Sequence, residues 1–170
     1  MATTLHRPMQ PKLAMLNWVL DALGVSANIA TFGDRKAVQK AVYLAQRADV
    51  DLGYRHGWYV QGPYSRGLAR DYYQLSEALA IGESAGPSRL DKSQADVLGN
   101  LRTLLEPPEG MVLGKAEWLE LLASINFLVT KSKLDDAGVN RVMQREKANL
   151  FPHIARGRQA LRERGLLPDA

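Results

Sequence analysis

The segment from Lys115 to Thr130 constrains the fold of this 170-residue chain more than any other, because apolar side chains nearly surround it. It carries Trp118, Ile125 and Phe127 together with four leucines and a valine. A helix that is apolar on most sides lies in the centre of a core, since each face needs an apolar neighbour. At about 16 residues it is shorter than the roughly 20 residues that a membrane span requires. The sequence therefore predicts a domain of helices packed around this one.

Six other segments repeat apolar residues at helical spacing, and loops rich in Gly, Pro or polar residues separate them. The expected helices cover residues 11–23, 35–48, 66–81, 91–105, 136–147 and 152–164. Asp34 and Ser65 are the expected N-caps of the second and third helices, because their side chains accept from free backbone N–H groups. Two later N-caps have alternatives that stay open, Ser88 or Asp91 and Asp135 or Asp136. The predicted class is mainly α, with about seven helices and one or two short strands.

The chain length and composition fit a single compact domain. We expect this domain to span residues 11–170, after a loose lead-in at residues 1–10. The lead-in is polar and lacks the apolar stretch of a signal peptide.

Periodicity assigns an inward and an outward face to the expected helix at residues 35–48. Its valines and alanines lie inward, whereas Lys36, Lys40 and Arg47 are expected to lie mostly away from that face. Glu120 sits within the apolar central segment, and two interpretations of it stay open. Its carboxylate is either half-buried and paired with a basic residue of another helix, or placed at a solvated edge.

The densest group of aromatic residues lies just before the third expected helix. Trp58, Tyr59 and Val60 favour a short strand. Gly62 and Pro63 then end it, because Gly tolerates unusual backbone angles and Pro fixes its own φ. Most of these rings are expected in the core, since aromatic residues dominate core area. A helix pair followed by a strand and a turn is compatible with a winged-helix arrangement, although the spacing does not require one.

Residue types that carry catalysis or hold metals are scarce in this sequence. There is no cysteine, which excludes disulfides and thiolate ligands and fits a reducing cytoplasm. His6, His56 and His153 are far apart and lack metal-ligand spacing. The patterns of a phosphate-binding loop and of a nucleophile elbow are absent. We therefore predict a protein that is not an enzyme, without catalytic residues, metal or cofactor. A hydrolase or nuclease that uses scattered carboxylates is the least favoured class.

Basic residues gather in two places where they could contact phosphates. Arg66, Arg70 and Tyr73 fall on a face of the third helix away from its apolar stripe, with Arg55 as a further candidate. Residues 141–164 contain seven basic and two acidic residues, so this segment has a net charge of 7 − 2 = +5. The whole chain has a net charge of +4, so the remainder is about neutral at 4 − 5 = −1. Its candidate phosphate ligands are Arg156, Arg158, Arg162 and Arg164. Such a segment either binds phosphate backbones or forms a solvated helical face.

Several blocks resemble the YwgA-like proteins of bacteria and archaea over about residues 34–167. The matching blocks are 40–46, 52–54, 58–65, 118–123 and 147–167, and the motif Tyr-x-x-Gly-Pro-Tyr-Ser is the most specific of them. More distantly, the layout is similar to the Panacea antitoxin domain, which also has a Gly-Pro turn after a helix. The first resemblance implies no particular activity. The second implies a small helical, non-enzymatic module that binds a partner protein. Ala148-Asn149 stands where the family pattern has a nearby Pro.

Two functions follow as expectations. The first is a regulatory or defence-associated module that binds nucleic acid through Arg66, Arg70 and Tyr73 and through the four arginines of the last helix; the sequence leaves DNA and RNA equally open. The second is an antitoxin-like module that neutralises or scaffolds a partner protein. Its expected contact residues are Tyr59, Gly62, Pro63 and Tyr64. A homodimer is compatible with either function, and no membrane association is expected.

Overall fold

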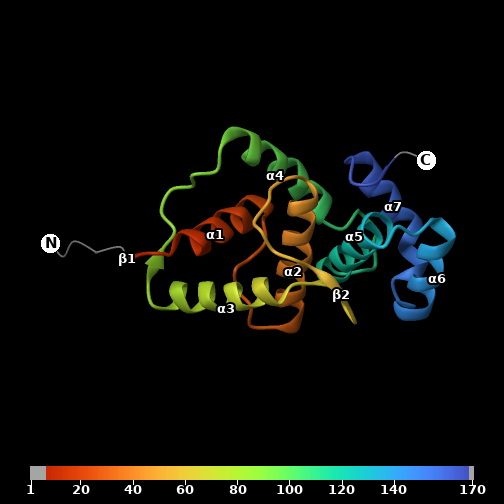
Figure 1. The fold of residues 1–170 in the computed structure, drawn as a ribbon, viewed down its shortest axis with the longest axis horizontal. Helices are drawn as coiled ribbons and strands as arrows, with labels where there is room; N and C mark the ends of the chain where they lie inside the picture. Colours follow the sequence, from red (N-terminus) through yellow and green to blue (C-terminus); the bar gives the residue numbers. More distant parts are fainter. Residues whose placement is uncertain (1–6, 169–170) are drawn as a thin grey trace.

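The computed structural model describes residues 7–168, and over this range the chain forms seven α-helices and four short strands. They are β1 (Arg7–Pro8), α1 (Pro11–Leu23), α2 (Phe32–Arg47), β2 (Gly57–Tyr59), β3 (Gly62–Tyr64), α3 (Arg66–Ala80), β4 (Glu83–Ser84), α4 (Lys92–Leu105), α5 (Lys115–Thr130), α6 (Asp136–Glu146) and α7 (Ile154–Glu163). Figure 1 shows the helices as one mainly α fold, which confirms the predicted class. The winged-helix arrangement is not confirmed. Within this range no helix has both the length and the apolar character needed to cross a membrane.

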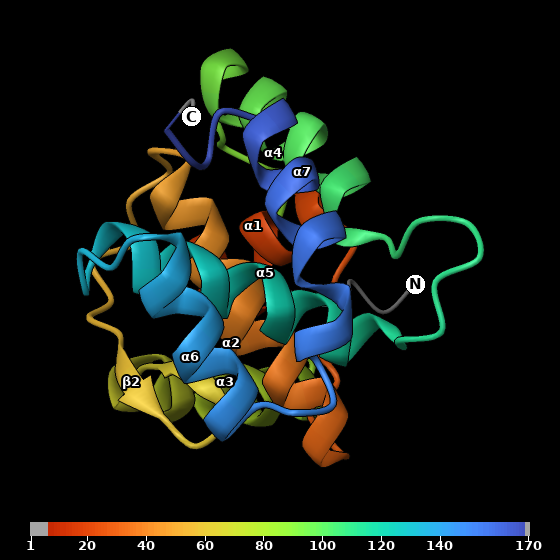
Figure 2. The ribbon, with the colours of Figure 1, turned by 90° about the vertical axis from the view of Figure 1, so that its right-hand side faces the viewer.

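Helix α5 lies at the centre of the protein, as its apolar surface predicts. Every residue from Trp118 to Leu128 is buried. The helix contacts α2, α4, α6, α7 and β3, and Figure 2 shows it between α2 on one side and α6 and α7 on the other. Its bounds coincide with the predicted segment. The neighbours are needed because a helix with apolar residues on most sides is stable only when all those sides are covered.

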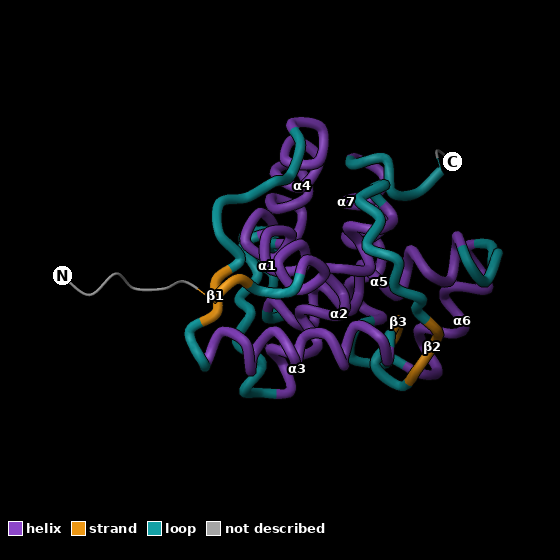
Figure 3. Tube along the Cα trace, turned by 60° about the vertical axis from the view of Figure 1, so that its left-hand side comes forward, coloured by secondary structure: helices purple, strands orange, loops and turns teal. Residues whose placement is uncertain are grey.

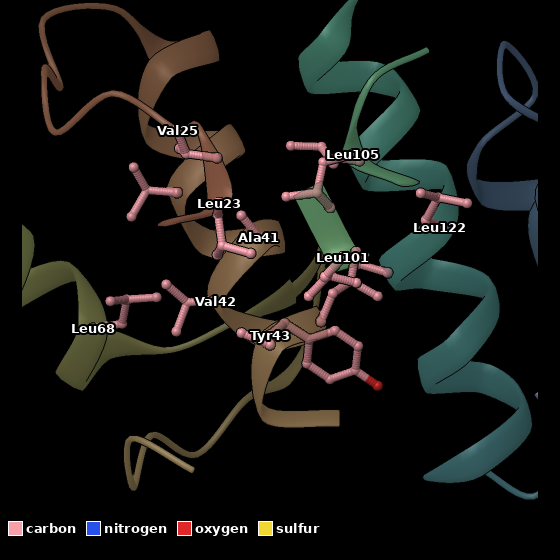
Figure 4. Packing of buried hydrophobic residues seen from close by; sticks show 14 of the residues in the cluster. Leu23, Val25, Ala41, Val42, Tyr43, Leu68, Leu101, Leu105 and Leu122 are labelled. Atoms are coloured by element: carbon pink, nitrogen blue, oxygen red, sulfur yellow. The ribbon is translucent and has the colours of Figure 1, made fainter. Parts of the chain in front are cut away.

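Helix α2 packs into the same core from the other side. Figure 4 shows Ala41, Val42 and Tyr43 of α2 surrounded by leucines of other helices. The buried Tyr43 hydroxyl donates to Asn126 Oδ1 of α5 at 2.7 Å. Asn126 Nδ2 in turn donates to the Leu166 carbonyl at 2.6 Å, which ties the end of the chain to the core. These bonds satisfy polar groups that would be costly to bury alone.

Three of the predicted helix caps are confirmed, and one is wrong. Ser65, Asp91 and Asp135 accept from backbone N–H groups of the first turns of α3, α4 and α6. Helix α2, however, begins earlier than expected, because Thr31 rather than Asp34 is its N-cap. Thr31 Oγ1 accepts from the Asp34 N–H at 3.0 Å, and Asp34 Oδ2 accepts from the Thr31 N–H at 3.1 Å. Asp34 therefore completes a capping box from the third helical position.

The ends of the chain differ from expectation at two points. Arg7–Pro8 pairs in parallel with Glu83–Ser84, and Met9 is buried, so residues 7–10 are not the expected loose segment. Figure 3 shows β1 beside the connection that leaves α3. The rest of the expected lead-in, residues 1–6, lies outside the described range. At the other end Pro152 lies in a short 3₁₀ turn, and α7 begins after it.

The strands β2 and β3 form an antiparallel hairpin just before helix α3. Gly57 pairs with Tyr64, and Tyr59 pairs with Gly62. The hairpin packs on α2 and α5 and leads directly into α3. Gly62 has a φ of +86°, a conformation that residues with a Cβ rarely adopt. The predicted strand is present, but Gly62 and Pro63, which were expected to form the turn, begin the second strand instead. The turn lies at Val60 and Gln61.

Candidate functional site: a basic cleft beside helix α3

A cleft of about 660 Å³ lies where the first turn of α3 meets the start of α1 and the segment 51–57. Its lining includes four basic side chains, Lys12, Arg55, Arg66 and Arg70, and two acidic ones, Asp51 and Asp71. Tyr54, Tyr59 and Tyr64 also line it. The predicted pair Arg66 and Arg70 is therefore brought together with residues from distant parts of the chain.

Asp71 is buried at the base of the cleft, where it organises three neighbours. Its carboxylate accepts from the Tyr54 hydroxyl at 2.8 Å and from Lys12 Nζ at 3.2 Å, and it pairs with Arg70 Nε at 3.5 Å. Burial, together with the hydrogen bond and charge of Asp71, raises the pKa of Tyr54 well above its ordinary value. Tyr54 therefore stays a neutral donor. The negative charge of Asp71 is already paired with Lys12 and Arg70.

The other basic groups of the cleft have no such partner. Arg55 and Arg66 are exposed, and neither forms an ion pair with any described residue. The Arg70 side chain remains 66% exposed although its Nε contacts Asp71. Two free guanidinium groups and one partly free group thus surround the opening, which gives the cleft an excess of positive charge.

The first turn of α3 adds backbone donors to this cleft. A helix leaves its first N–H groups without intrahelical acceptors. The Ser65 N–H donates to Gln39 Oε1 at 2.9 Å, and the Leu68 N–H donates to Ser65 Oγ at 3.2 Å. Arg66 and Gly67 carry the other two N–H groups of this turn, and both residues line the cleft. A helix N-terminus of this kind favours anions.

The hairpin beside the cleft rests on a buried cluster of three lysines and one glutamate. Glu120, only 5% exposed, lies between Lys36 Nζ at 2.7 Å and Lys147 Nζ at 2.8 Å. Lys147 Nζ also donates to the Val60 carbonyl at 2.7 Å. Lys40 Nζ donates to the Pro63 carbonyl at 2.6 Å. We call these four ionic residues the lysine cluster. The lysine cluster holds the hairpin in place, because Lys40 and Lys147 donate to backbone carbonyls of the hairpin.

The lysine cluster corrects one expectation and decides another. Lys36 and Lys40 were predicted to lie away from the protein interior, but Lys40 is 1% exposed and the Lys36 side chain is 10% exposed. The hairpin covers this face of α2 and supplies the oxygen atoms that the two ammonium groups need. Glu120 is paired with basic residues from outside its own helix, which confirms the first of its two interpretations. Helical periodicity gave no sign that the hairpin would fold over these lysines.

Stability should depend on pH through Lys40. Burial lowers the pKa of Lys40 to about 7, with Lys147 and Lys36 acting in the same direction and Glu120 opposing them. The unfolded chain keeps the ordinary lysine pKa and so binds more protons than the folded protein above pH 7, which makes stability rise with pH. We expect the urea midpoint to increase between about pH 7 and 9 and the increase to shrink in Lys40→Met. The same pH dependence in both proteins would contradict this assignment.

A second, apolar hollow of about 380 Å³ lies on the other side of the hairpin. We call it the apolar groove, and its exposed members are Phe32, Tyr59, Val60 and Tyr73. Tyr59 and Tyr64 line both the groove and the basic cleft. Tyr73, predicted to act together with Arg66 and Arg70, lines only the groove. Of the four predicted partner-contact residues Tyr59 and Tyr64 line this surface, whereas Gly62 and Pro63 are buried.

The arginines of α7, and Arg164 just after it, do not join the basic cleft. Arg158 donates to Asn140 Oδ1 at 2.8 Å, and both Arg158 and Arg162 contact the Asp136 carboxylate, at 3.7 and 4.0 Å. Arg164 donates to the Asn100 carbonyl, and Arg156 remains exposed. Helices α7 and α3 lie far apart in both Figure 1 and Figure 3. Three of the four predicted phosphate ligands are thus engaged within the protein.

Comparisons with known proteins give no match: neither a family model, nor a curated protein, nor a solved structure is significantly similar to this chain. The resemblance to YwgA-like proteins and to the Panacea domain therefore stays a prediction. Among residues 7–168 no group of three or more His, Asp or Glu side chains is arranged to hold a metal ion.

Proposed function

We propose that the protein is a binding module for nucleic acid and that the basic cleft beside α3 contacts the phosphate backbone. The observation that carries this proposal is the exposed pair Arg55 and Arg66, which have no carboxylate partner among the described residues and lie next to the start of a helix. Surplus arginine at a helix N-terminus is suited to phosphate, because guanidinium groups and backbone N–H groups bind its oxygen atoms together.

The cleft supplies groups for two parts of a nucleotide. A phosphate would bind between the guanidinium groups of Arg55 and Arg66 and the N–H groups of Arg66 and Gly67. A base would stack on Tyr59, which is 45% exposed and is held edge-on against Tyr64 with ring centroids 5.3 Å apart. The lysine cluster beneath the hairpin would keep Tyr59 in place. DNA and RNA both offer these groups.

Removal of two arginines tests this proposal. We expect Arg66→Ala combined with Arg70→Ala to weaken binding of a labelled oligonucleotide at least about tenfold, because phosphate contacts dominate affinity. The slope of log K against log salt should also fall by roughly one to two. Fluorescence anisotropy at two salt concentrations measures both quantities, with duplex and single-stranded probes.

Two controls make the result specific. Arg89→Ala combined with Arg141→Ala removes the same charge from two exposed sites outside the cleft and should change binding little. Tyr73→Ser alters only the apolar groove and should leave binding intact. The proposal is wrong if the Arg66/Arg70 variant, folded by its melting temperature, binds as tightly as the charge-matched control. It is equally wrong if the unmodified protein does not bind at low salt.

A protein partner is the second candidate function, favoured by the apolar groove. Four of the seven large apolar side chains that are markedly exposed among the described residues line this one hollow. Exposed apolar side chains gathered in one place are typical of protein interaction sites. The antitoxin-like function predicted from sequence would use this groove. Absence of oligonucleotide binding at low salt would leave this function as the better supported one.

A further inference from the structure

A second basic hollow, of about 470 Å³, lies between the end of α2, the segment that follows it and the end of α5. Its lining includes Arg47, Arg55, His56 and Lys131. Of the described residues that line it, Asp51 is the only acidic one, and its Oδ1 accepts from the Gly53 N–H at 2.7 Å. Arg47, Arg55 and Lys131 form no ion pair with any residue between 7 and 168. We call this hollow the α2 hollow.

Two nitrogen atoms of the α2 hollow are buried without a partner. They are Arg47 Nε and His56 Nε2, and neither makes a hydrogen bond to another described residue. A buried polar atom left unpaired costs free energy, and proteins keep few of them. Two such atoms in one hollow, beside two further cations, favour an anion with several acceptor atoms.

The α2 hollow adjoins the basic cleft. Asp51, Tyr54 and Arg55 line both of them. The segment that carries these residues runs from the end of α2 back toward β2, as Figures 1 and 2 show. Gln46 holds it in place, because its Oε1 accepts from the Leu52 and Tyr54 N–H groups at 3.2 and 2.9 Å. Arg55 therefore lies at the boundary between two hollows of like charge.

We propose that a single strand of nucleic acid crosses Arg55, with one phosphate in the basic cleft and a following phosphate in the α2 hollow. This inference rests on the proposed function and specifies its ligand. A flexible strand can follow two adjoining hollows and stack a base on an aromatic ring that lines one of them, as Tyr59 lines the basic cleft. A duplex is stiff over this length, and its phosphates do not enter two concave sites on either side of one segment.

His56 provides a local reporter of the second phosphate. Burial, together with the charges of Lys40 and Lys131, lowers the pKa of His56 to about 4 against a backbone hydrogen bond at Gln39 that raises it, so the ring is neutral at pH 7. Arg47, Arg55 and Asp51 also line its hollow, and the Tyr43 ring packs against it edge-on at 5.3 Å. A phosphate beside Nε2 would raise the pKa of His56, because a nearby negative charge favours the protonated ring. Binding should then take up protons and strengthen as pH falls.

The test compares two double variants on single-stranded probes of about 12 nucleotides, oligo(dT) and oligo(U). Arg47→Gln with Lys131→Gln should weaken binding at least about tenfold and lower the salt slope by about 0.7, as expected for the loss of one phosphate contact on a single strand. Arg89→Gln with Arg141→Gln removes the same charge elsewhere and should have little effect. A matched duplex should bind more weakly than either single strand. A difference between the two probes shows whether the site prefers the DNA or the RNA strand, which differ in the sugar and in one methyl group of the base.

The outcomes separate this inference from the proposed function. If Arg66→Ala with Arg70→Ala weakens binding while the Arg47/Lys131 variant matches its control, the single-strand path is wrong and the basic cleft stands. If neither variant weakens binding, both proposals fail. The unmodified protein gives an independent readout, since oligo(dT) should shift the His56 ring resonances and raise its pKa. Unchanged His56 resonances at saturation would overturn the second phosphate site even if the Arg47/Lys131 variant folds poorly.

Discussion

Glu120→Gln is expected to lower the free energy of unfolding by about 3 to 5 kcal/mol, the cost typical of breaking a buried ion pair from one side. The substitution leaves Lys36 and Lys147 in place with ammonium groups that have lost their shared carboxylate. An amide oxygen can still accept a hydrogen bond, but it carries no negative charge to offset the two cations. With Lys40 nearby, the uncompensated positive charge under the hairpin makes this the most sensitive ionic position that the structure describes.

Urea unfolding at pH 7 measures this loss, and the same helix provides a matched control. Glu117 lies in the first turn of α5, is partly exposed and makes no ion pair with the described residues. Glu117→Gln removes the same charge and should lower the free energy of unfolding by less than about 1 kcal/mol, because only the interaction of the carboxylate with the helix dipole is lost. Equal losses in the two variants would show that the lysine cluster contributes no special stability.

Gly62→Ala is expected to destabilise the protein by about 3 kcal/mol, the sum of a left-handed backbone penalty and local overpacking. Gly62 has a φ of +86°, and a Cβ built there would lie 2.6 Å from Ser124 Oγ. Ser124 is fully buried on α5, the central helix, so the hydroxyl has little room to move aside. The hairpin would have to lift from α5, which would also disturb Tyr59 and Tyr64.

Two comparisons separate the clash from the backbone strain. Gly82 has a similar φ of +83° with nothing within 4 Å of its added Cβ, so Gly82→Ala reports the strain alone and should cost about 1 to 2 kcal/mol. Ser124→Ala removes a buried hydroxyl that has no partner and should be nearly neutral. Combined with Gly62→Ala, it should recover part of the loss. No recovery in the double variant would show that the Ser124 hydroxyl is not the obstacle.

Local patterns in the sequence predict most of the helical architecture. The bounds of α1 and α5 coincide with the segments expected from apolar spacing and from the breaks around them. Ser65 is recognisable as an N-cap because it follows a Gly-Pro turn and precedes an amphipathic stretch. The predicted helix boundaries are wrong at two helix starts. At α2 both Thr31 and Asp34 are suitable N-cap residues, and at α7 Pro152 lies in a 3₁₀ turn that precedes the helix.

The candidate site was foreseeable only in part. Arg66 and Arg70 belong to one helix, so their spacing alone puts them on one exposed face. Lys12 is 59 residues from Asp71 in sequence, and nothing in the local pattern indicates that its Nζ reaches that carboxylate. Tyr73 shares the exposed side of α3 with the two arginines, but the hairpin divides that side into a basic cleft and an apolar groove.

The sequence by itself determined the mainly helical class, the central place of α5 and the short strand before α3, because these depend on the spacing of apolar residues and on local strand-forming residues. Only the tertiary structure decided which charges are free. It buried Lys40 and Lys147, and most of the Lys36 side chain, under the hairpin, and it paired most of the α7 arginines with other residues. Arg55 and Arg66 were left without an acidic partner among residues 7–168. Local spacing says which side of a helix a charge takes, whereas the neighbours that neutralise it come from distant parts of the chain.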